Sequence, residues 1–256
     1  LLYPLHGRIA NTPAHAVELT VDGDNGEITV TGVVDEGRLF GNKLRLKATY
    51  TTRVGQPGFD LRDDVTNLSG EPGDLELLYH VNFGIPLLNP GSKVVLPALK
   101  VAPRDEVAMG NVPEWDTYGP ETPGSPEAVF FVELAADSAG NTRAVLHNDS
   151  AKQGVRLKLN KNQLPCFTVW KNRQAEADGY ATGLEPGLNF PNPKSFEKAQ
   201  GRVVSLAPGA SRSFEIRLEA LADAEGVRAA CDAVERLRDG AKPEVLAEPD
   251  PVWSSS

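Results

Sequence analysis

Residues 43–52, KLRLKATYTT, alternate polar with apolar side chains: Leu44, Leu46 and Ala48 are each flanked by charged or hydroxyl-bearing residues. Successive side chains of a β-strand point to opposite faces of the sheet. A period of two therefore predicts a strand with one face in water and the other packed. The same alternation returns near the C-terminus over residues 213–218, SFEIRL.

Similar segments fill most of the chain, and turn-forming residues separate them. A turn at residues 22–26, DGDNG, precedes an alternating run over residues 28–33. Further strands are predicted over residues 59–67, 75–83, 128–134, 143–147, 155–159, 167–170 and 202–206. Turns with glycine or proline every ten residues or so favour an all-β sandwich over alternating strands and helices.

One helix is predicted, over residues 223–238, because its apolar residues recur at offsets of three, four and seven. Asp223 is placed to cap its start and Gly240 to end it. We predict one domain over residues 1–240. The Pro-rich tail over residues 241–256 is expected to be partly disordered or loosely wrapped.

Composition excludes several classes of protein. The 256 residues are enough for a sizeable core, and 26 basic against 35 acidic residues give a net charge of −9. This acidic balance argues against a nucleic-acid partner, which needs clustered Lys and Arg. No apolar run of about 18 residues is present, so no membrane-spanning helix is predicted.

The two cysteines, Cys166 and Cys231, are 65 residues apart. This spacing excludes a CxxC-type zinc site and argues against a disulfide framework, and it favours a reducing, cytoplasmic location. Both are expected to be small buried hydrophobic residues. The sequence also lacks the motifs of zinc proteases, phosphate-binding loops, α/β-hydrolases and dinucleotide-binding folds.

Three residues are candidates for acid–base chemistry. His80 shares a strand face with Asn82, a pair that either completes a buried hydrogen-bond network or faces a ligand. Glu185 lies in an apolar segment before Pro186. There it either accepts backbone N–H bonds or, through desolvation, has a raised pKa suited to a general base. His6 precedes Gly7 and Arg8, at a turn or beside a cleft.

Taken together, these segments resemble the aldose 1-epimerase, or galactose mutarotase-like, superfamily, and specifically its poorly characterised aldose 1-epimerase-related branch. The matching stretches are residues 6–9 (HGRI), 79–84 (YHVNFG), 183–191 (GLEPGLNFP) and 206–209 (LAPG). Their order, with a second His about 75 residues after the first and a Glu about 105 residues further on, carries the likeness. The resemblance covers nearly the whole chain.

The resemblance implies a β-supersandwich with one C-terminal helix, and a cleft where two histidines and a glutamate meet. His80 would be the general acid at the sugar ring oxygen, Glu185 the general base at the anomeric hydroxyl, and His6 a hydrogen-bonding group near the ring oxygen. No metal or other cofactor is implied. Relatives of this type carry strands before the His-Gly segment, so we expect the recorded chain to lack N-terminal strands.

Further sugar-contacting residues are candidates only. Their side chains suit hydroxyl groups, ring faces or an acidic substituent, and they are Arg8, Asn82, Trp115, Asp116 and Lys171. The chain is thus predicted to be an enzyme that interconverts the anomers of a sugar by general acid–base ring opening. Two alternatives stay open: a non-catalytic carbohydrate-binding protein, and a sugar isomerase of the same fold with different chemistry. The oligomeric state is not predicted.

Overall fold

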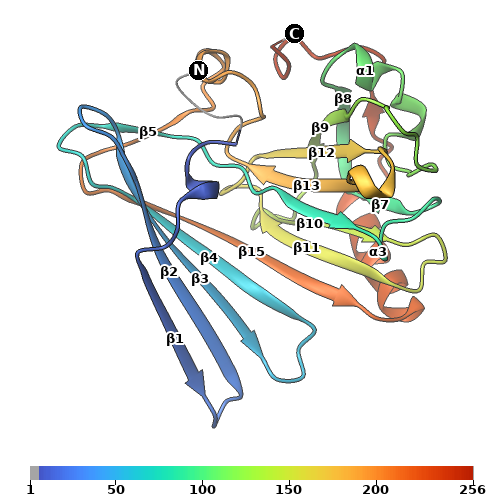
Figure 1. Cartoon of the computed structure of the whole chain (residues 1–256). Coiled ribbons are helices and arrows are strands. Elements are labelled where there is room, and N and C mark those ends of the chain that lie inside the picture. Colours follow the sequence, from blue (N-terminus) through green and yellow to red (C-terminus); the bar gives the residue numbers. More distant parts are fainter. Residues whose placement is uncertain (1–5, 256) are drawn as a thin grey trace. The chain divides into compact units, whose positions relative to one another are not determined.

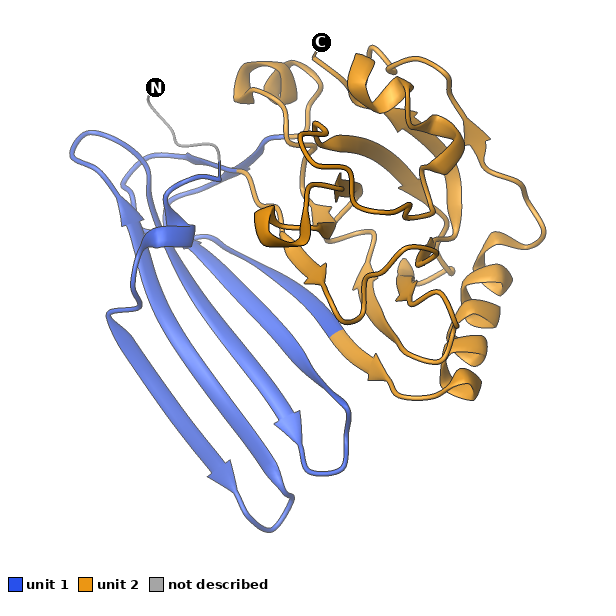
Figure 2. Ribbon diagram, turned by 45° about the vertical axis from the view of Figure 1, so that its right-hand side comes forward, with its two compact units in different colours: residues 1–75, 203–217 blue, residues 76–202, 218–256 orange. Residues whose placement is uncertain are grey.

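The alternating stretch at residues 43–52 forms strand β3 (Lys43–Arg53) in the computed structural model, which describes residues 6–255. Strands dominate the structure (Figure 1), as the alternation predicted. The chain forms two compact units, one of residues 1–75 with 203–217 and one of residues 76–202 with 218–256 (Figure 2). Strand β15 (Ser211–Leu221) starts in the first unit and ends in the second.

The first unit contains an antiparallel meander. Its strands, in order along the sheet, are β1 (Ala16–Asp22), β2 (Glu27–Gly37), β3, β4 (Gly58–Asn67) and the first part of β15. A short pair, β5 (Gly73–Leu75) with β14 (Val204–Leu206), and a 3₁₀ turn, η1 (Ile9–Asn11), complete the unit. Strands β1 to β4 are consecutive in sequence because short turns join them, whereas β15 comes from near the C-terminus.

The two faces of this meander differ as the period-two pattern predicted. The Arg62 guanidinium on β4 pairs with Asp64 and with Glu215 of β15 on the polar face. On the other face Leu61 and Val65 are buried, whereas the apolar side chains of edge strand β1 remain exposed. The apolar face is therefore well covered at β4 and open at β1.

The second unit contains two runs of paired strands. One follows the order β16 (Glu244–Val245), β8 (Ala98–Pro103), β9 (Ala128–Leu134), β12 (Cys166–Asn172), β13 (Ala181–Gly187) and β6 (Val81–Gly84). The other follows the last part of β15, then β11 (Gly154–Asn160), β10 (Asn141–His147) and β7 (Lys93–Val95). The first run is apolar in composition and almost entirely buried at β9, β12 and β13.

The predicted C-terminal helix is α3 (Ala224–Arg238). The Asp223 side chain accepts a hydrogen bond from the backbone N–H of Gly226, which is an N-cap, and Ala230 and Val234 pack on Val145 of β10. Two further helices, α1 (Glu106–Met109) and α2 (Lys194–Ala199), and the 3₁₀ turns η2 (Val112–Glu114) and η3 (Glu176–Asp178) were not predicted. Each is too short to show a periodic apolar stripe.

The C-terminal tail is held by specific contacts instead of being loosely wrapped. Strand β16 pairs in parallel with β8, and Asp250 forms an ion pair with Lys100. The Trp253 ring packs on Phe190 with centroids 5.4 Å apart. No helix within residues 6–255 has the length and hydropathy to cross a membrane.

Candidate active site

The segment that carries His80 runs alongside the end of β13 without forming a continuous strand. A strand over residues 75–83 was predicted, but β5 ends at Leu75 and β6 begins at Val81. The backbone N–H of Tyr79 donates to the carbonyl of Pro186 at 2.9 Å, and Pro186 has no N–H to return the bond. The ladder is interrupted there, and His80 lies at the break.

His80 and Glu185 are in direct contact in the second unit. His80 Nε2 lies 2.9 Å from Glu185 Oε1, while the exposed fractions of the two side chains are 28% and 3%. The contact is a close ion pair, and the buried Oε1 has no aligned hydrogen-bond donor among residues 6–255. The structure thus brings together two residues that the resemblance pairs, and their roles in a reaction stay predictions.

The other ring nitrogen of His80 faces Asn82. His80 Nδ1 lies 2.7 Å from Asn82 Oδ1, and the amide oxygen can only accept, so Nδ1 carries a proton. The contact of Nε2 with Glu185 raises the pKa of His80 above its usual 6.5; burial lowers it, and the bond to Asn82 raises it further. Both nitrogens therefore face acceptors, which favours the doubly protonated imidazolium.

The Trp170 ring lies against the ring of His80. The two rings meet edge to face with centroids 5.5 Å apart, and the indole Nε1–H donates to Glu127 Oε2 at 2.6 Å. Sequence analysis selected the neighbouring Lys171 instead of Trp170. Alternation along β12 places these two side chains on opposite faces of the sheet, and Trp170 is the one on the face of Glu185.

Thr168 is a second residue that sequence analysis missed. It is the cross-strand partner of Glu185, and its side chain is fully buried. Its Oγ1 has no hydrogen-bond partner in the part of the chain that the structure describes. A single threonine in an apolar strand gives no signal of its own, because only the register of β12 against β13 brings it to the carboxylate.

Lys171 holds a loop on the opposite face of the sheet. Its Nζ donates to the carbonyls of Glu114 and Thr117, the latter at 2.8 Å, and lies 4.7 Å from the centre of the Tyr118 ring. Burial lowers the pKa of Lys171 to about 8.

Trp115 and Asp116 belong to this loop. The Asp116 carboxylate accepts a hydrogen bond from the Thr117 hydroxyl at 3.1 Å, and Trp115 is partly exposed. No contact in the described structure links either residue or Lys171 to Glu185, so their sugar-binding roles stay predictions.

His6 and Arg8 lie in the first unit, just before and at the start of η1. His6 is exposed and Arg8 is partly buried. His80, Asn82 and Glu185 all belong to the second unit. The predicted participation of His6 and Arg8 in the site therefore stays a prediction.

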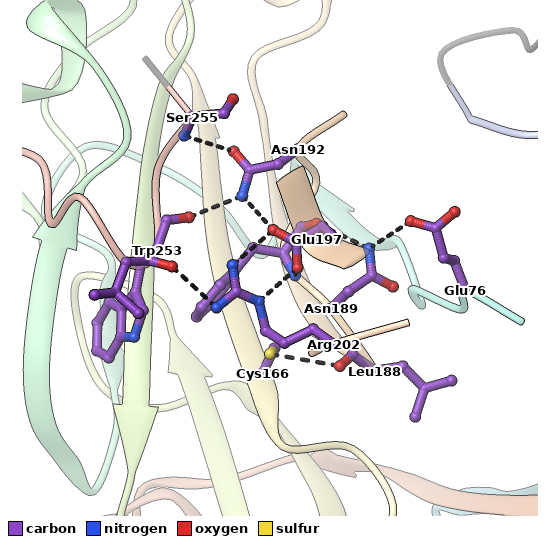
Figure 3. A network of polar contacts seen from close by, with 11 residues as sticks. Glu76, Cys166, Leu188, Asn189, Asn192, Glu197, Arg202, Trp253 and Ser255 are labelled. Atoms are coloured by element: carbon purple, nitrogen blue, oxygen red, sulfur yellow. Dashed lines mark hydrogen bonds and ion pairs between the residues drawn. The ribbon is translucent and has the colours of Figure 1, made fainter. Parts of the chain in front are cut away.

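A separate polar network secures the loop that follows β13 (Figure 3). Glu197 is completely buried and forms a two-pronged ion pair with Arg202, with oxygen–nitrogen distances of 2.6 and 2.8 Å. The same carboxylate accepts bonds from the Phe190 backbone N–H and the Asn192 amide. The amide of Asn192 also donates to the Trp253 carbonyl, so the network joins this loop to the C-terminal tail.

Among residues 6–255, no group of three or more His, Cys, Asp and Glu side chains is arranged to hold a metal ion. Cys166 is buried in an apolar cluster with Val129, Phe131 and Phe190, and burial raises its pKa to about 12. It is an inert hydrophobic residue, as predicted.

Comparison with known proteins identifies the fold. A crystal structure of a "putative aldose 1-epimerase" from Klebsiella pneumoniae is 32% identical to the chain, with a TM-score of 0.92, and covers 95% of this chain. The chain spans 64% of that protein, which is less than two thirds of its length. A galactose mutarotase-like protein from Clostridium acetobutylicum is 19% identical, with a TM-score of 0.57, over 82% of this chain and 66% of its own.

The similarity to the Clostridium acetobutylicum protein concerns the fold alone, and it indicates the same fold as the similarity to the Klebsiella pneumoniae protein. The predicted resemblance and the predicted galactose mutarotase-like, all-β fold are both confirmed. A search of the curated proteins finds no match. The model of one family, described as "Domain of unknown function (DUF4432)", matches residues 2–220. The chain therefore belongs to the DUF4432 family and has a galactose mutarotase-like fold.

Proposed function

We propose that the protein interconverts the anomers of a sugar by general acid–base ring opening, with His80 as the acid and Glu185 as the base. The observation that supports this most directly is the contact between an imidazole with both nitrogens facing acceptors and a carboxylate that is 97% shielded from solvent. Ring opening removes one proton and delivers another at neighbouring atoms of the sugar. A protonated His80 can deliver the one, and an ionised Glu185 can accept the other.

In the proposed reaction, the Glu185 carboxylate takes the proton from the anomeric hydroxyl. The C1–O1 bond becomes a carbonyl as the bond from C1 to the ring oxygen breaks. The ring oxygen leaves with that electron pair and takes a proton from the His80 imidazolium. Rotation about C1–C2 presents the other face of the aldehyde. Closure returns the ring proton to neutral His80 and gives the Glu185 proton back to O1.

In the proposed reaction the sugar enters between the two groups, which contact each other in the structure. The Trp170 ring lies beside His80 and offers an apolar surface for a pyranose face. Glu127 fixes the direction of that ring through the indole N–H. Asn82 fixes the imidazole by accepting from Nδ1, so Nε2 is the nitrogen that delivers the proton.

The test uses polarimetry or NMR to monitor how fast a freshly dissolved anomer equilibrates, for each of a panel of aldoses. Glu185→Gln and His80→Ala are each expected to lower kcat/KM by about 10²–10⁴-fold, the usual contribution of one positioned acid or base. His147→Ala and Glu133→Gln are matched controls, because these residues lie outside the site and have partners of their own, the Asn148 carbonyl and Lys161.

Two results would overturn the proposal. In one, sugars raise the melting temperature but no anomer equilibrates faster than in buffer, which would make the protein a carbohydrate-binding protein without turnover. In the other, Glu185→Gln and His80→Ala turn over as fast as the wild type. A reaction that changes the carbon skeleton or another stereocentre would appear as new NMR signals, and it would replace anomer exchange by a different isomerase chemistry.

A further inference from the structure

Gly183 occupies the centre of the face on which the proposed acid and base lie. It is buried in the middle of β13, opposite Asn82 of β6 on one side and Trp170 of β12 on the other. Glu185 follows two residues later, so its side chain leaves the strand on the same face. Three side chains of the candidate site therefore surround a position that has no side chain of its own.

The backbone does not require glycine at this position. The φ angle of Gly183 lies outside the left-handed region that favours glycine, so an L-residue fits the strand without strain. Glycine within a strand is also unfavourable for stability, because it loses more entropy on folding and packs nothing. The reason for glycine must lie in the space that a side chain at position 183 would fill.

That space is occupied by the Glu185 carboxylate. A Cβ at position 183 would lie 2.4 Å from Glu185 Oε1 and 3.2 Å from Cγ and Cδ of the same side chain. A separation of 2.4 Å is far below a van der Waals contact, and the same Oε1 is the atom 2.9 Å from His80 Nε2. Since these atoms form the flexible end of a side chain, a methyl group would displace the carboxylate and leave the strand intact.

We infer that Gly183 is a positioning residue, whose missing side chain gives the Glu185 carboxylate the place from which it contacts His80. This rests on the proposed function as far as catalysis is concerned, while the placement of the carboxylate can be measured without any sugar. Trp170 and Asn82 flank the same space, so the Glu185 carboxylate lies between their side chains, directly above the backbone of Gly183.

The test is Gly183→Ala, with the imidazole of His80 titrated by NMR. The pKa of His80 is raised chiefly by Glu185, so moving the carboxylate away should lower it. In an anomer-exchange assay kcat should fall by about 10²-fold, the cost of a misplacement of about 1 Å, with a smaller change in KM. The melting temperature should change little, because the gain from alanine in a strand opposes the loss of the His80–Glu185 contact.

Gly84→Ala is the matched control. Gly84 lies in β6 of the same sheet, and a Cβ there would approach only the Tyr180 carbonyl, at 3.4 Å. This variant should leave both the His80 pKa and the rate unchanged. A Gly183→Ala protein whose His80 titrates like that of the wild type would overturn the inference.

A double variant tests whether Gly183 acts through Glu185. In the Glu185→Gln background the charge is already gone, so adding Gly183→Ala should not lower the His80 pKa further. A further fall of the same size as in the single variant would refute the inference, because the alanine would then act on His80 by another route. If the wild type exchanges no anomers, the proposed reaction fails, and the titrations still decide the role of Gly183.

Discussion

Thr168 and Glu185 face each other across strands β12 and β13, and each buries an oxygen without a hydrogen-bond partner among the described residues. Leaving a polar group buried and unsatisfied costs about 1–3 kcal/mol. Two such atoms on one face of a sheet are expected where a ligand supplies the missing bonds. The pair therefore adds Thr168 to the part of the candidate site that lies on β12, next to Trp170.

Replacing Thr168 by Val should weaken sugar binding without weakening the fold. Valine has the same shape but no hydroxyl, and losing an unsatisfied buried oxygen is neutral or stabilising. We expect KM to rise about tenfold, the effect of losing one hydrogen bond of about 1.4 kcal/mol, while the melting temperature stays the same or rises. Steady-state anomer exchange and thermal unfolding measure the two effects. Thr168→Ser keeps the hydroxyl and should retain a KM near that of the wild type; equal KM values in all three proteins would contradict a binding role.

The rate of anomer exchange should fall at alkaline pH as the His80 imidazolium loses its proton. The pKa of His80 is raised above 6.5, so the decline is centred above that pH. The same shift links stability to pH. Stabilisation by the His80–Glu185 contact is complete below the pKa of unfolded His80 and is lost as pH rises through the folded pKa.

A pH–rate profile and urea unfolding of wild type and His80→Ala at several pH values would check both effects. The difference in free energy of unfolding between the two proteins should shrink with rising pH. A difference that grows instead would show that His80 is held neutral in the folded protein.

The buried Lys171 should give the protein a second pH dependence with the opposite sign. Burial lowers its pKa from 10.5 to about 8, so between these values the unfolded chain binds a proton that the folded chain lacks. Stability contributed by this position therefore rises with pH from about 8 to 10.5, by at most about 1.4 kcal/mol per pH unit. Urea unfolding of wild type and Lys171→Met across this range measures it. Parallel curves for the two proteins would show that Lys171 keeps its usual pKa.

Removing the charge of Glu197 should destabilise the fold strongly. The substitution Glu197→Gln leaves the mostly buried Arg202 guanidinium without its anionic partner, which costs about 3–5 kcal/mol in free energy of unfolding. Adding Arg202→Met should recover much of this loss, since the uncompensated charge is then gone. Chemical denaturation of the two single variants and the double variant gives the coupling free energy between Glu197 and Arg202. Additive losses would mean that the two residues act independently.

Much of the fold follows from local pattern. Alternation predicted β3 and the middle of β15, and the stripe of apolar residues with its capping Asp223 predicted α3. The predicted strand over residues 75–83 was wrong in its middle for two reasons. The chain leaves its partner strand β14 after Leu75 and meets β13 only at Leu78, and Pro186, opposite Tyr79, cannot return a backbone bond. The interruption depends on a residue more than 100 positions away, which no local window includes.

The candidate site was also predictable only in part, because local motifs mark single residues but do not show which strands pair. His80 and Glu185 come from separate motifs, and the structure brings them together. Alternation alone says that Trp170 and Lys171 face opposite sides of β12, but not which side carries Glu185. The register that pairs Thr168 with Glu185 decides this, and it placed Trp170 at the site and Lys171 against a loop.

The edge-to-face packing of Trp170 on His80 also provides an intrinsic optical reporter. An excited indole transfers an electron readily to a nearby imidazolium and far less readily to a neutral imidazole, so Trp170 emission should brighten as His80 loses its proton. The chain has only three tryptophans, and the other two, Trp115 and Trp253, can be changed to phenylalanine to isolate this signal. Charge changes at His80 can then be followed by fluorescence in millisecond mixing experiments, without a label and without a coloured substrate.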